Sequence, residues 1–236
     1  IIRGLVGSEM CIRDRVEFSS LNYKDALSAS GTKGVTKVYP HTPGIDAAGI
    51  VEQSNDENFP IGSSVIVTGF DLGMDTSGGF SEYIRVPSRW AVKCSSNFST
   101  KEAMMLGTAG MTVGLAILSM ADKLPLDKSK AVVSGATGGV GSIGVKLLSQ
   151  LGADVTAITG KMNKRSWLKE LGASKVLDRK RFIDSTNHPL SKGKYDIALD
   201  VVGGRILSSI IACMNYNGII TTCGNVGGPQ FETSVF

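Results

Sequence analysis

The sequence predicts an α/β protein in which a doubly wound parallel sheet follows a smaller, mostly-β domain. Three observations support this fold class. Short apolar runs separated by Gly, Pro, Asn and Asp fill the first half of the chain, as in small β domains. From Lys130 onward, strand-like runs alternate with helix-like stretches, which is the pattern of βαβ units. A glycine-rich segment, Gly135–Gly141, joins the first of these strands to its helix.

The composition is that of a globular protein. The 236 residues are 42% hydrophobic and 19% charged, and the 29 glycines follow no collagen-like period, which excludes collagen and intrinsic disorder. A net charge of +4 with scattered Lys and Arg is too weak to indicate nucleic-acid binding. No apolar run reaches the roughly 18 residues of a membrane span, so we expect no membrane partner. Four cysteines without a CxxC pair favour a reduced, cytoplasmic protein.

Residues 1–15 are expected to be foreign to the protein. Residues 4–15 read GLVGSEMCIRDR, which resembles the translation of a sequencing-library adapter. Such segments are set aside before fold reasoning, and any true targeting signal is then not observable. The alternative is a genuine N-terminal strand. We therefore assign residues 16–126 to the β domain and residues 127–236 to a nucleotide-binding domain, both incomplete.

The β domain is expected to contain several short strands and one long helix. Strands are predicted at residues 16–20, 49–53, 64–68 and 83–86, with turn signals at Pro43-Gly44 and at residues 59–62. Ser99–Glu102 has the pattern of a capping box. It predicts the start of an apolar helix that runs to about Met120.

The second domain is predicted to be a Rossmann-type sheet. Strands are expected at residues 131–134, 154–159, 175–178, 195–201 and 218–223, with helices at 141–151 and 163–171. A full dinucleotide-binding fold has six strands, so this one is expected to be truncated.

The glycine-rich segment is predicted to bind a dinucleotide. It reads G-x-x-G-x-x-G, one residue longer in its first gap than the usual fingerprint, and consists of Gly135, Ala136, Thr137, Gly138, Gly139, Val140 and Gly141. Glycines let the backbone approach a pyrophosphate, and the following helix N-terminus offers free N–H groups. The alternative is a tight strand-to-helix turn without a ligand.

The end of the next strand predicts NADPH rather than NADH. NAD-preferring sites carry an acid about twenty residues after the loop, whereas Thr159, Gly160 and Lys161 stand here. Lys161, Lys164 and Arg165 are expected at the start of a helix, where cations oppose the macrodipole. A bound 2′-phosphate would turn that cost into an advantage. The alternative is a solvated basic turn.

Several segments match one family in the same order along the chain. They are SSLNYKDAL from Ser19, PGIDAAG from Pro43, GGFSEY from Gly78, GTAGMT from Gly107, the glycine-rich segment, and MNYNG from Met214. On these segments the chain resembles the acrylyl-CoA reductase and quinone oxidoreductase family, a zinc-independent branch of the medium-chain dehydrogenases/reductases. The match covers essentially Val16 to Phe236, and family members are longer.

This resemblance implies a GroES-like first domain and NADPH-dependent reduction of the C=C bond of an enoyl-CoA such as acrylyl-CoA. It also implies a homodimer formed through a sixth strand that this chain lacks. An NADPH-dependent quinone reductase and a non-catalytic NADPH-binding protein remain as alternatives, because the sequence does not fix the substrate.

No metal site is predicted. Zinc requires three or four Cys, His or acidic ligands, and the chain has two histidines, His41 and His188. Zinc members of the superfamily carry Gly-His-Glu where this chain has Gly44-Ile45-Asp46, so Ile45 replaces the His ligand. The four-cysteine structural lobe is absent from the sequence as well.

Candidate catalytic residues follow from the implied reaction. Hydride addition to an activated C=C bond leaves an enolate oxygen that needs a hydrogen-bond donor and an α-carbon that needs a proton. Tyr23 is the first candidate for this donor and for a neighbour of the nicotinamide. Asn22 would orient substrate or cofactor, and Asp25 would hold the strand-to-helix corner. The alternatives are a packing tyrosine and ordinary turn hydrogen bonds.

Three further residues are expected near the cofactor. By resemblance Thr108 borders the nicotinamide, although small residues there would also allow close helix packing. Asn225 and Val226 follow the fifth strand, and ligands of doubly wound sheets gather at the carboxyl ends of strands.

Overall fold

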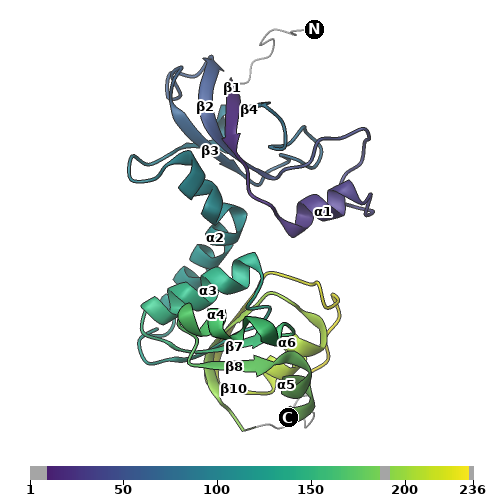
Figure 1. Ribbon diagram of the computed structural model, residues 1–236, viewed down its shortest axis with the longest axis vertical. Coiled ribbons are helices and arrows are strands. Elements are labelled where there is room, and N and C mark those ends of the chain that lie inside the picture. The colour runs from purple at the N-terminus through teal and green to yellow at the C-terminus, as the bar shows by residue number, and fades with distance from the viewer. Residues whose placement is uncertain (1–9, 187–191, 234–236) are drawn as a thin grey trace. The chain divides into compact units, whose positions relative to one another are not determined.

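The computed structural model describes residues 10–186 and 192–233, which form two compact units, Ile1–Met111 and Thr112–Phe236 (Figure 1). The first unit contains an antiparallel sheet and the second a parallel sheet. The predicted fold class is thereby confirmed. The units divide inside one helix, earlier than the boundary that we expect at residues 126 and 127, and that boundary stays a prediction.

Unit 1 is built on a five-stranded sheet with the order β4-β1-β2-β3-β5. Side chains alternate between its two faces, so that β3 buries Val65 and Val67 toward a core that also contains Ile12, Val51 and Ile84. The elements of the unit are β1 (Cys11–Phe18), α1 (Tyr23–Ala29), β2 (Asp46–Ser54), β3 (Ser64–Thr68), β4 (Tyr83–Pro87), η1 (Ser88–Trp90) and β5 (Ala91–Lys93).

Helix α2 (Thr100–Ala121) begins in unit 1 and ends in unit 2. The predicted capping box is confirmed, since the Ser99 N–H donates to Glu102 Oε2 at 2.9 Å and the Glu102 N–H donates to Ser99 Oγ at 3.2 Å. The helix is interrupted at Gly107, whose φ of 49° and ψ of −150° are not helical. By length and composition alone α2 could cross a membrane, with a mean hydropathy of 1.6 over 18 residues. One such helix is weak evidence, and the break at Gly107 divides it.

The segment that we expect to be foreign takes part in the first sheet. Residues 11–15 form the first part of β1 and pair with β2 and β4. Ile12 and Asp14 are both fully buried, because alternate side chains of β1 face the core. Neither carboxylate oxygen of Asp14 has a hydrogen-bond partner in the described part of the chain. That residues 1–15 are foreign to the protein stays a prediction. A buried acid without a hydrogen-bond partner among the described residues, such as Asp14, is the kind of defect that a foreign segment would introduce into the core.

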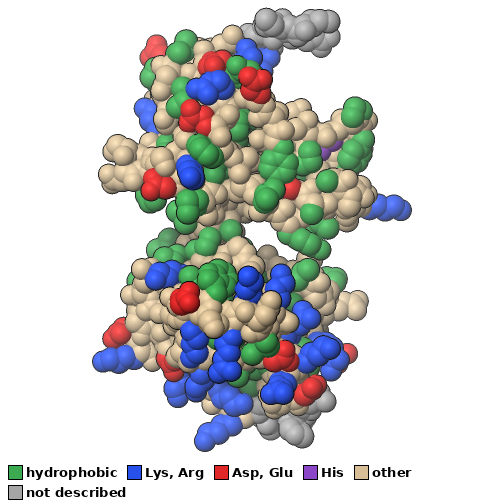
Figure 2. Space-filling view, viewed as in Figure 1, with side chains coloured by type: hydrophobic (Ala, Val, Ile, Leu, Met, Phe, Trp, Pro, Cys, Tyr) green, Lys and Arg blue, Asp and Glu red, His purple; other side chains and the backbone are tan. Residues whose placement is uncertain are grey.

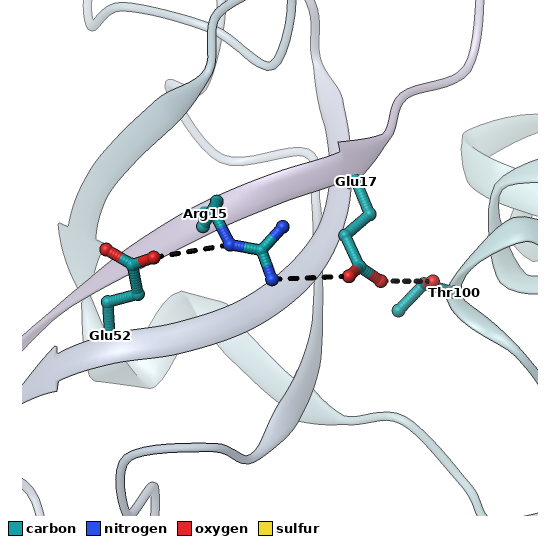
Figure 3. A network of polar contacts seen from close by, with 4 residues as sticks. All are labelled: Arg15, Glu17, Glu52 and Thr100. Atoms are coloured by element: carbon teal, nitrogen blue, oxygen red, sulfur yellow. Dashed lines mark hydrogen bonds and ion pairs between the residues drawn. The ribbon is translucent and has the colours of Figure 1, made fainter.

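Arg15 connects the outer face of the same strands (Figure 3). Its Nε lies 3.2 Å from Glu52 Oε1 on β2, and its Nη2 lies 3.5 Å from Glu17 Oε1. The Thr100 hydroxyl donates to Glu17 Oε2 at 2.9 Å, which joins β1 to the first turn of α2. Because these side chains are partly exposed, the ion pairs contribute little stability, about 1 kcal/mol or less each.

Unit 2 is a parallel sheet with the strand order β10-β9-β6-β7-β8, and each of the five predicted strands is present. The helix expected at residues 163–171 is divided into a 3₁₀ turn and a short α-helix. The elements are β6 (Lys130–Val133), α3 (Gly139–Gln150), β7 (Asp154–Thr159), η2 (Met162–Lys164), α4 (Arg165–Glu170), β8 (Lys175–Asp178), α5 (Arg179–Ser185), β9 (Tyr195–Asp200), α6 (Gly204–Ile211) and β10 (Met214–Thr222).

Helices cover both faces of the parallel sheet. On one face, Val133 and Val155 belong to the same core as Leu148 of α3. On the other, Val132 shares a core with Phe182 of α5 and with Ile206 and Ile210 of α6. The strands are therefore buried on both sides, as in doubly wound folds. Because all strands run in the same direction, their carboxyl ends and the loops that follow lie at one edge of the sheet.

Replacing Asp14 by Val is expected to raise the free energy of unfolding by about 1–3 kcal/mol at neutral pH, because a buried polar group without a partner is costly. Burial raises the pKa of Asp14 from 3.8 to about 7, and the negative charge of Glu17 adds to this rise. The folded chain therefore binds the proton more tightly than the unfolded chain does. Stability should fall as the pH rises from about 4 to about 7.

Urea denaturation across that pH range measures both effects. Asp14→Asn is the matched control, since it retains the shape of the side chain and removes the titration. Identical pH dependence in the parent chain and Asp14→Asn would contradict the burial of a titrating carboxyl at this position.

Candidate functional site

One buried carboxylate, that of Asp46 at the start of β2, joins three segments of unit 1. Its Oδ2 accepts hydrogen bonds from Asn22 Nδ2 at 2.9 Å and from the Thr108 backbone N–H at 2.8 Å. Its Oδ1 accepts one from the Thr108 hydroxyl at 2.6 Å. Ser19 Oγ donates to the Asp46 carbonyl at 2.6 Å. The segment after β1, the start of β2 and the break in α2 are thus held around a single side chain.

The break in α2 depends on Gly107. Its φ of 49° lies in the left-handed region that favours glycine. A Cβ at this position would lie 2.2 Å from Ser20 Oγ and 2.6 Å from Asp46 Oδ2. Both the backbone and the available space therefore require glycine. The non-helical turn leaves the Thr108 N–H available to Asp46, where it makes the 2.8 Å hydrogen bond.

Asp25 occupies a second buried position in the same corner. Its Oδ2 accepts the Asn22 backbone N–H at 2.7 Å, which closes the first turn of α1. Its Oδ1 accepts the N–H groups of Gly44 and Ile45 at 3.2 and 2.9 Å. Asp25 thereby connects α1 to the segment that leads into β2. Its part in catalysis stays a prediction.

Tyr23 differs from its neighbours because its side chain is open to solvent. It is the first residue of α1 and is 60% exposed, whereas Asn22 and Thr108 are partly buried in the Asp46 network. Within the described residues its hydroxyl has no hydrogen-bond partner, so it can donate to a ligand. The structure thus brings Asn22, Asp25 and Thr108 into one corner and places Tyr23 on its surface.

In unit 2 the glycine-rich segment forms a tight cradle after β6. Gly135 has a φ of +55°, and a Cβ there would lie 2.5 Å from Val201 Cγ2. A Cβ at Gly141 would lie 2.3 Å from the Gly135 carbonyl oxygen, and Gly138 caps the N-terminus of α3. The first N–H groups of a helix have no partner inside it, so those of α3 can receive the oxygens of a pyrophosphate. This cradle fits a dinucleotide.

A second buried carboxylate, that of Asp200, supports the edge of the sheet beside the cradle. It accepts hydrogen bonds from the Ser134 hydroxyl at 2.5 Å, from the Gly203 N–H at 2.9 Å and from the Thr222 hydroxyl at 3.2 Å. The ends of β6, β9 and β10 are therefore linked through one residue. Asn225 and its neighbour Val226 follow β10 and are exposed. Asn225 lies beside Gly203, since a Cβ placed on Gly203 would lie 3.1 Å from Asn225 Cα.

An open pocket of about 280 Å³ lies beside the cradle and is lined by Thr137, Lys161, Lys164 and Trp167. Thr137 Oγ1 lies 3.1 Å from Thr159 Oγ1, which accepts the Lys161 backbone N–H at 3.0 Å. Arg165, which we expect beside these lysines, does not line the pocket, whereas Trp167 does. Figure 2 shows Lys and Arg side chains gathered on the visible face of unit 2, with acidic side chains between some of them.

Sequence reasoning did not identify Asp46, Asp200 or Trp167. The two acids carry a signal that could have found them, since each lies at one end of an apolar strand, where an acid requires several donors. Trp167 carries no comparable signal, because an aromatic residue on a short helix is ordinarily packing.

The described residues contain no group of three or more His, Cys, Asp and Glu side chains that could hold a metal ion. Ile45 stands in the corner beside Asp25, and His41 Nε2 lies 2.8 Å from the Gly73 carbonyl oxygen. His188 lies outside the described residues.

Two family models match the chain. The alcohol dehydrogenase GroES-like domain matches residues 9–96, and the model described as zinc-binding dehydrogenase matches residues 139–236. Among curated relatives, the "Putative quinone oxidoreductase YhfP" of Bacillus subtilis is 41% identical over 94% of this chain and 68% of its own length. The acrylyl-CoA reductase AcuI of Ruegeria pomeroyi is 36% identical over 93% of this chain and 67% of its own.

Solved structures give the same picture. The crystal structure of Escherichia coli YhdH with bound NADPH superposes on this chain with a TM-score of 0.90 at 40% sequence identity. The match covers 95% of this chain and 69% of the YhdH chain. The Bacillus subtilis protein yhfP with NAD bound has a TM-score of 0.89 at 41% identity, with coverages of 95% and 68%.

Replacing Asp46 by Ala is expected to lower the free energy of unfolding by about 2–4 kcal/mol, because Asn22 and the Thr108 N–H would lose their buried acceptor. Urea denaturation measures the loss. Asp71→Ala, at an exposed acid of the same unit, is the control and should change stability by about 0.5 kcal/mol or less. Equal effects of the two substitutions would show that the Asp46 network contributes nothing specific.

Proposed function

The chain belongs to the acrylyl-CoA reductase and quinone oxidoreductase family of the medium-chain dehydrogenases/reductases, and from this we propose that it reduces the C=C bond of an enoyl-CoA with NADPH. The observation that carries this proposal is the glycine cradle with a cationic pocket beside it, on a chain whose relatives include named acrylyl-CoA reductases. Chemistry of this class needs a nicotinamide cofactor, and the residues at the edge of the parallel sheet fit one.

Each part of the cofactor has residues suited to it. Gly135–Gly141 would receive the pyrophosphate, and Lys161 and Lys164 would face the 2′-phosphate. Asn225 and Val226 would lie toward the nicotinamide. When bound, NADPH supplies a hydride for the β-carbon of the enoyl group. Relatives have been crystallised with NADP, NADPH and NAD, so the preference for NADPH rests on the cations of this chain.

The residues of the unit 1 corner would act on the thioester. Reduction adds a hydride to the β-carbon and a proton to the α-carbon, and negative charge develops on the thioester oxygen in between. The exposed Tyr23 hydroxyl can donate to that oxygen or give the proton, which it would regain from water. Asn22 and Thr108, both fixed by Asp46, would orient the acyl group or the cofactor amide, and Asp25 keeps α1 in register with them.

A quinone reductase is the second candidate, because relatives named quinone oxidoreductase match the chain as well as those named acrylyl-CoA reductase. Parallel assays of NADPH oxidation with acrylyl-CoA and with benzoquinone separate the two. We expect the higher kcat/KM with acrylyl-CoA. A strong preference for benzoquinone would refute the enoyl-CoA proposal, and NADPH binding without either turnover would favour a non-catalytic protein. The homodimer and the cytoplasmic location stay predictions.

Tyr23→Phe is expected to lower kcat by about 10- to 100-fold while the Kd of NADPH stays unchanged, because the substitution removes one donor hydroxyl and little else. Steady-state kinetics and a binding titration measure the two quantities. Tyr216→Phe is the matched control, since Tyr216 is 95% exposed in unit 2. A Tyr23→Phe variant with the parent kcat would remove Tyr23 from the mechanism.

A further inference from the structure

Two loops at the carboxyl edge of the parallel sheet pack against each other through their glycines. They are residues 201–204 after β9 and residues 223–228 after β10. A Cβ placed on Gly204 would lie 2.4 Å from the Gly227 carbonyl oxygen, so the two backbones approach without a side chain between them. The Gly227 N–H also donates to the Val202 carbonyl oxygen at 2.7 Å. The position of the second loop, which we place toward the nicotinamide, therefore depends on the first.

The carboxylate of Asp200 connects this pair of loops to the glycine cradle. Its Oδ2 accepts the Gly203 N–H of the first loop and the Thr222 hydroxyl at the end of β10. Its Oδ1 accepts the Ser134 hydroxyl, directly before the cradle. The Ser134 oxygen in turn accepts the Val201 N–H at 2.9 Å. One side chain thus fixes the start of both loops and links them to the strand that leads into the cradle.

The cradle and the loop after β10 differ in how far they depend on Asp200. The cradle has backbone hydrogen bonds of its own, from the Gly138 N–H to the Gly135 carbonyl at 2.8 Å and from the Ala136 N–H to the Ile158 carbonyl at 3.1 Å. The loop after β10 is exposed at its centre, so the contacts at its ends hold it in place. Loss of the Asp200 carboxylate should therefore release this loop and leave the cradle formed.

We propose that Asp200 is a positioning residue that sets the nicotinamide half of the cofactor relative to the adenosine half. It is fully buried, and it acts by holding the loop after β10 beside the cradle. This inference rests on the proposed function, because it takes the ligand to be a dinucleotide with its pyrophosphate on the cradle. Hydride transfer requires close and aligned reacting atoms, and a displacement of about 1 Å can lower the rate about a hundredfold.

The test compares Asp200→Ala with Asp196→Ala. Asp196 lies near the opposite end of β9, where it accepts the Lys130 N–H at 2.8 Å and the Asn215 side-chain amide at 2.7 Å. Titrations of the full chain use NADPH and 2′,5′-ADP, which lacks the nicotinamide half. We expect Asp200→Ala to raise the Kd of NADPH about tenfold and that of 2′,5′-ADP by less than about twofold. Asp196→Ala should change neither Kd by more than about twofold.

Two milder variants cover the case in which Asp200→Ala does not fold. Thr222→Val removes only the hydroxyl that joins β10 to Asp200, and it should raise the Kd of NADPH about threefold without changing that of 2′,5′-ADP. Asp200→Asn retains an oxygen for the Gly203 N–H and should bind NADPH within about threefold of the parent chain. Equal weakening of the two ligands by Asp200→Ala or Thr222→Val, or no weakening of NADPH, would overturn the inference.

The titrations require no turnover, so the inference and the proposed function can fail separately. A chain that shows the selective loss of NADPH affinity and yet reduces no enoyl-CoA would retain the role of Asp200 and refute the proposed function. A chain that reduces enoyl-CoA but loses affinity for both ligands equally would retain the function and overturn the role of Asp200.

Discussion

A buried carboxylate must find donors for its oxygens, and both units of this chain use that requirement to hold their loops. Asp46 obtains its donors from Asn22 and from both the backbone and the hydroxyl of Thr108. Asp200 obtains its donors from Ser134, Gly203 and Thr222. Each network joins segments that are distant in sequence. The positions of the candidate catalytic corner and of the cofactor edge follow from these two networks.

Asp14 shows what happens when the same requirement is not met. It is as deeply buried as Asp46 and Asp200, yet neither of its oxygens has a partner in the described residues. Burial of an acid is therefore not in itself a sign of function. The number of donors separates a carboxylate that organises a site from one that only destabilises the fold.

Elements with strong local signals could be predicted from the sequence. The strands Ser64–Thr68, Asp154–Thr159 and Lys175–Asp178 have the predicted bounds, since turn residues and apolar runs define them without help from distant contacts. The hydrogen-bond partners of the buried acids could not be predicted in the same way. Asp46 acquires its role through hydrogen bonds with Asn22 and Thr108, which lie far away along the chain.

The cradle and the cationic pocket differ in how the chain builds them. Gly135–Gly141 is one continuous segment in which a Cβ at Gly135 or Gly141 would meet neighbouring atoms at 2.5 Å or less. The cations Lys161 and Lys164 come instead from the turn after β7 and from η2, where side chains are exposed. Natural variation can therefore exchange the cations one at a time while the cradle stays fixed. In such a fold the choice between two cofactors can evolve separately from the ability to bind either.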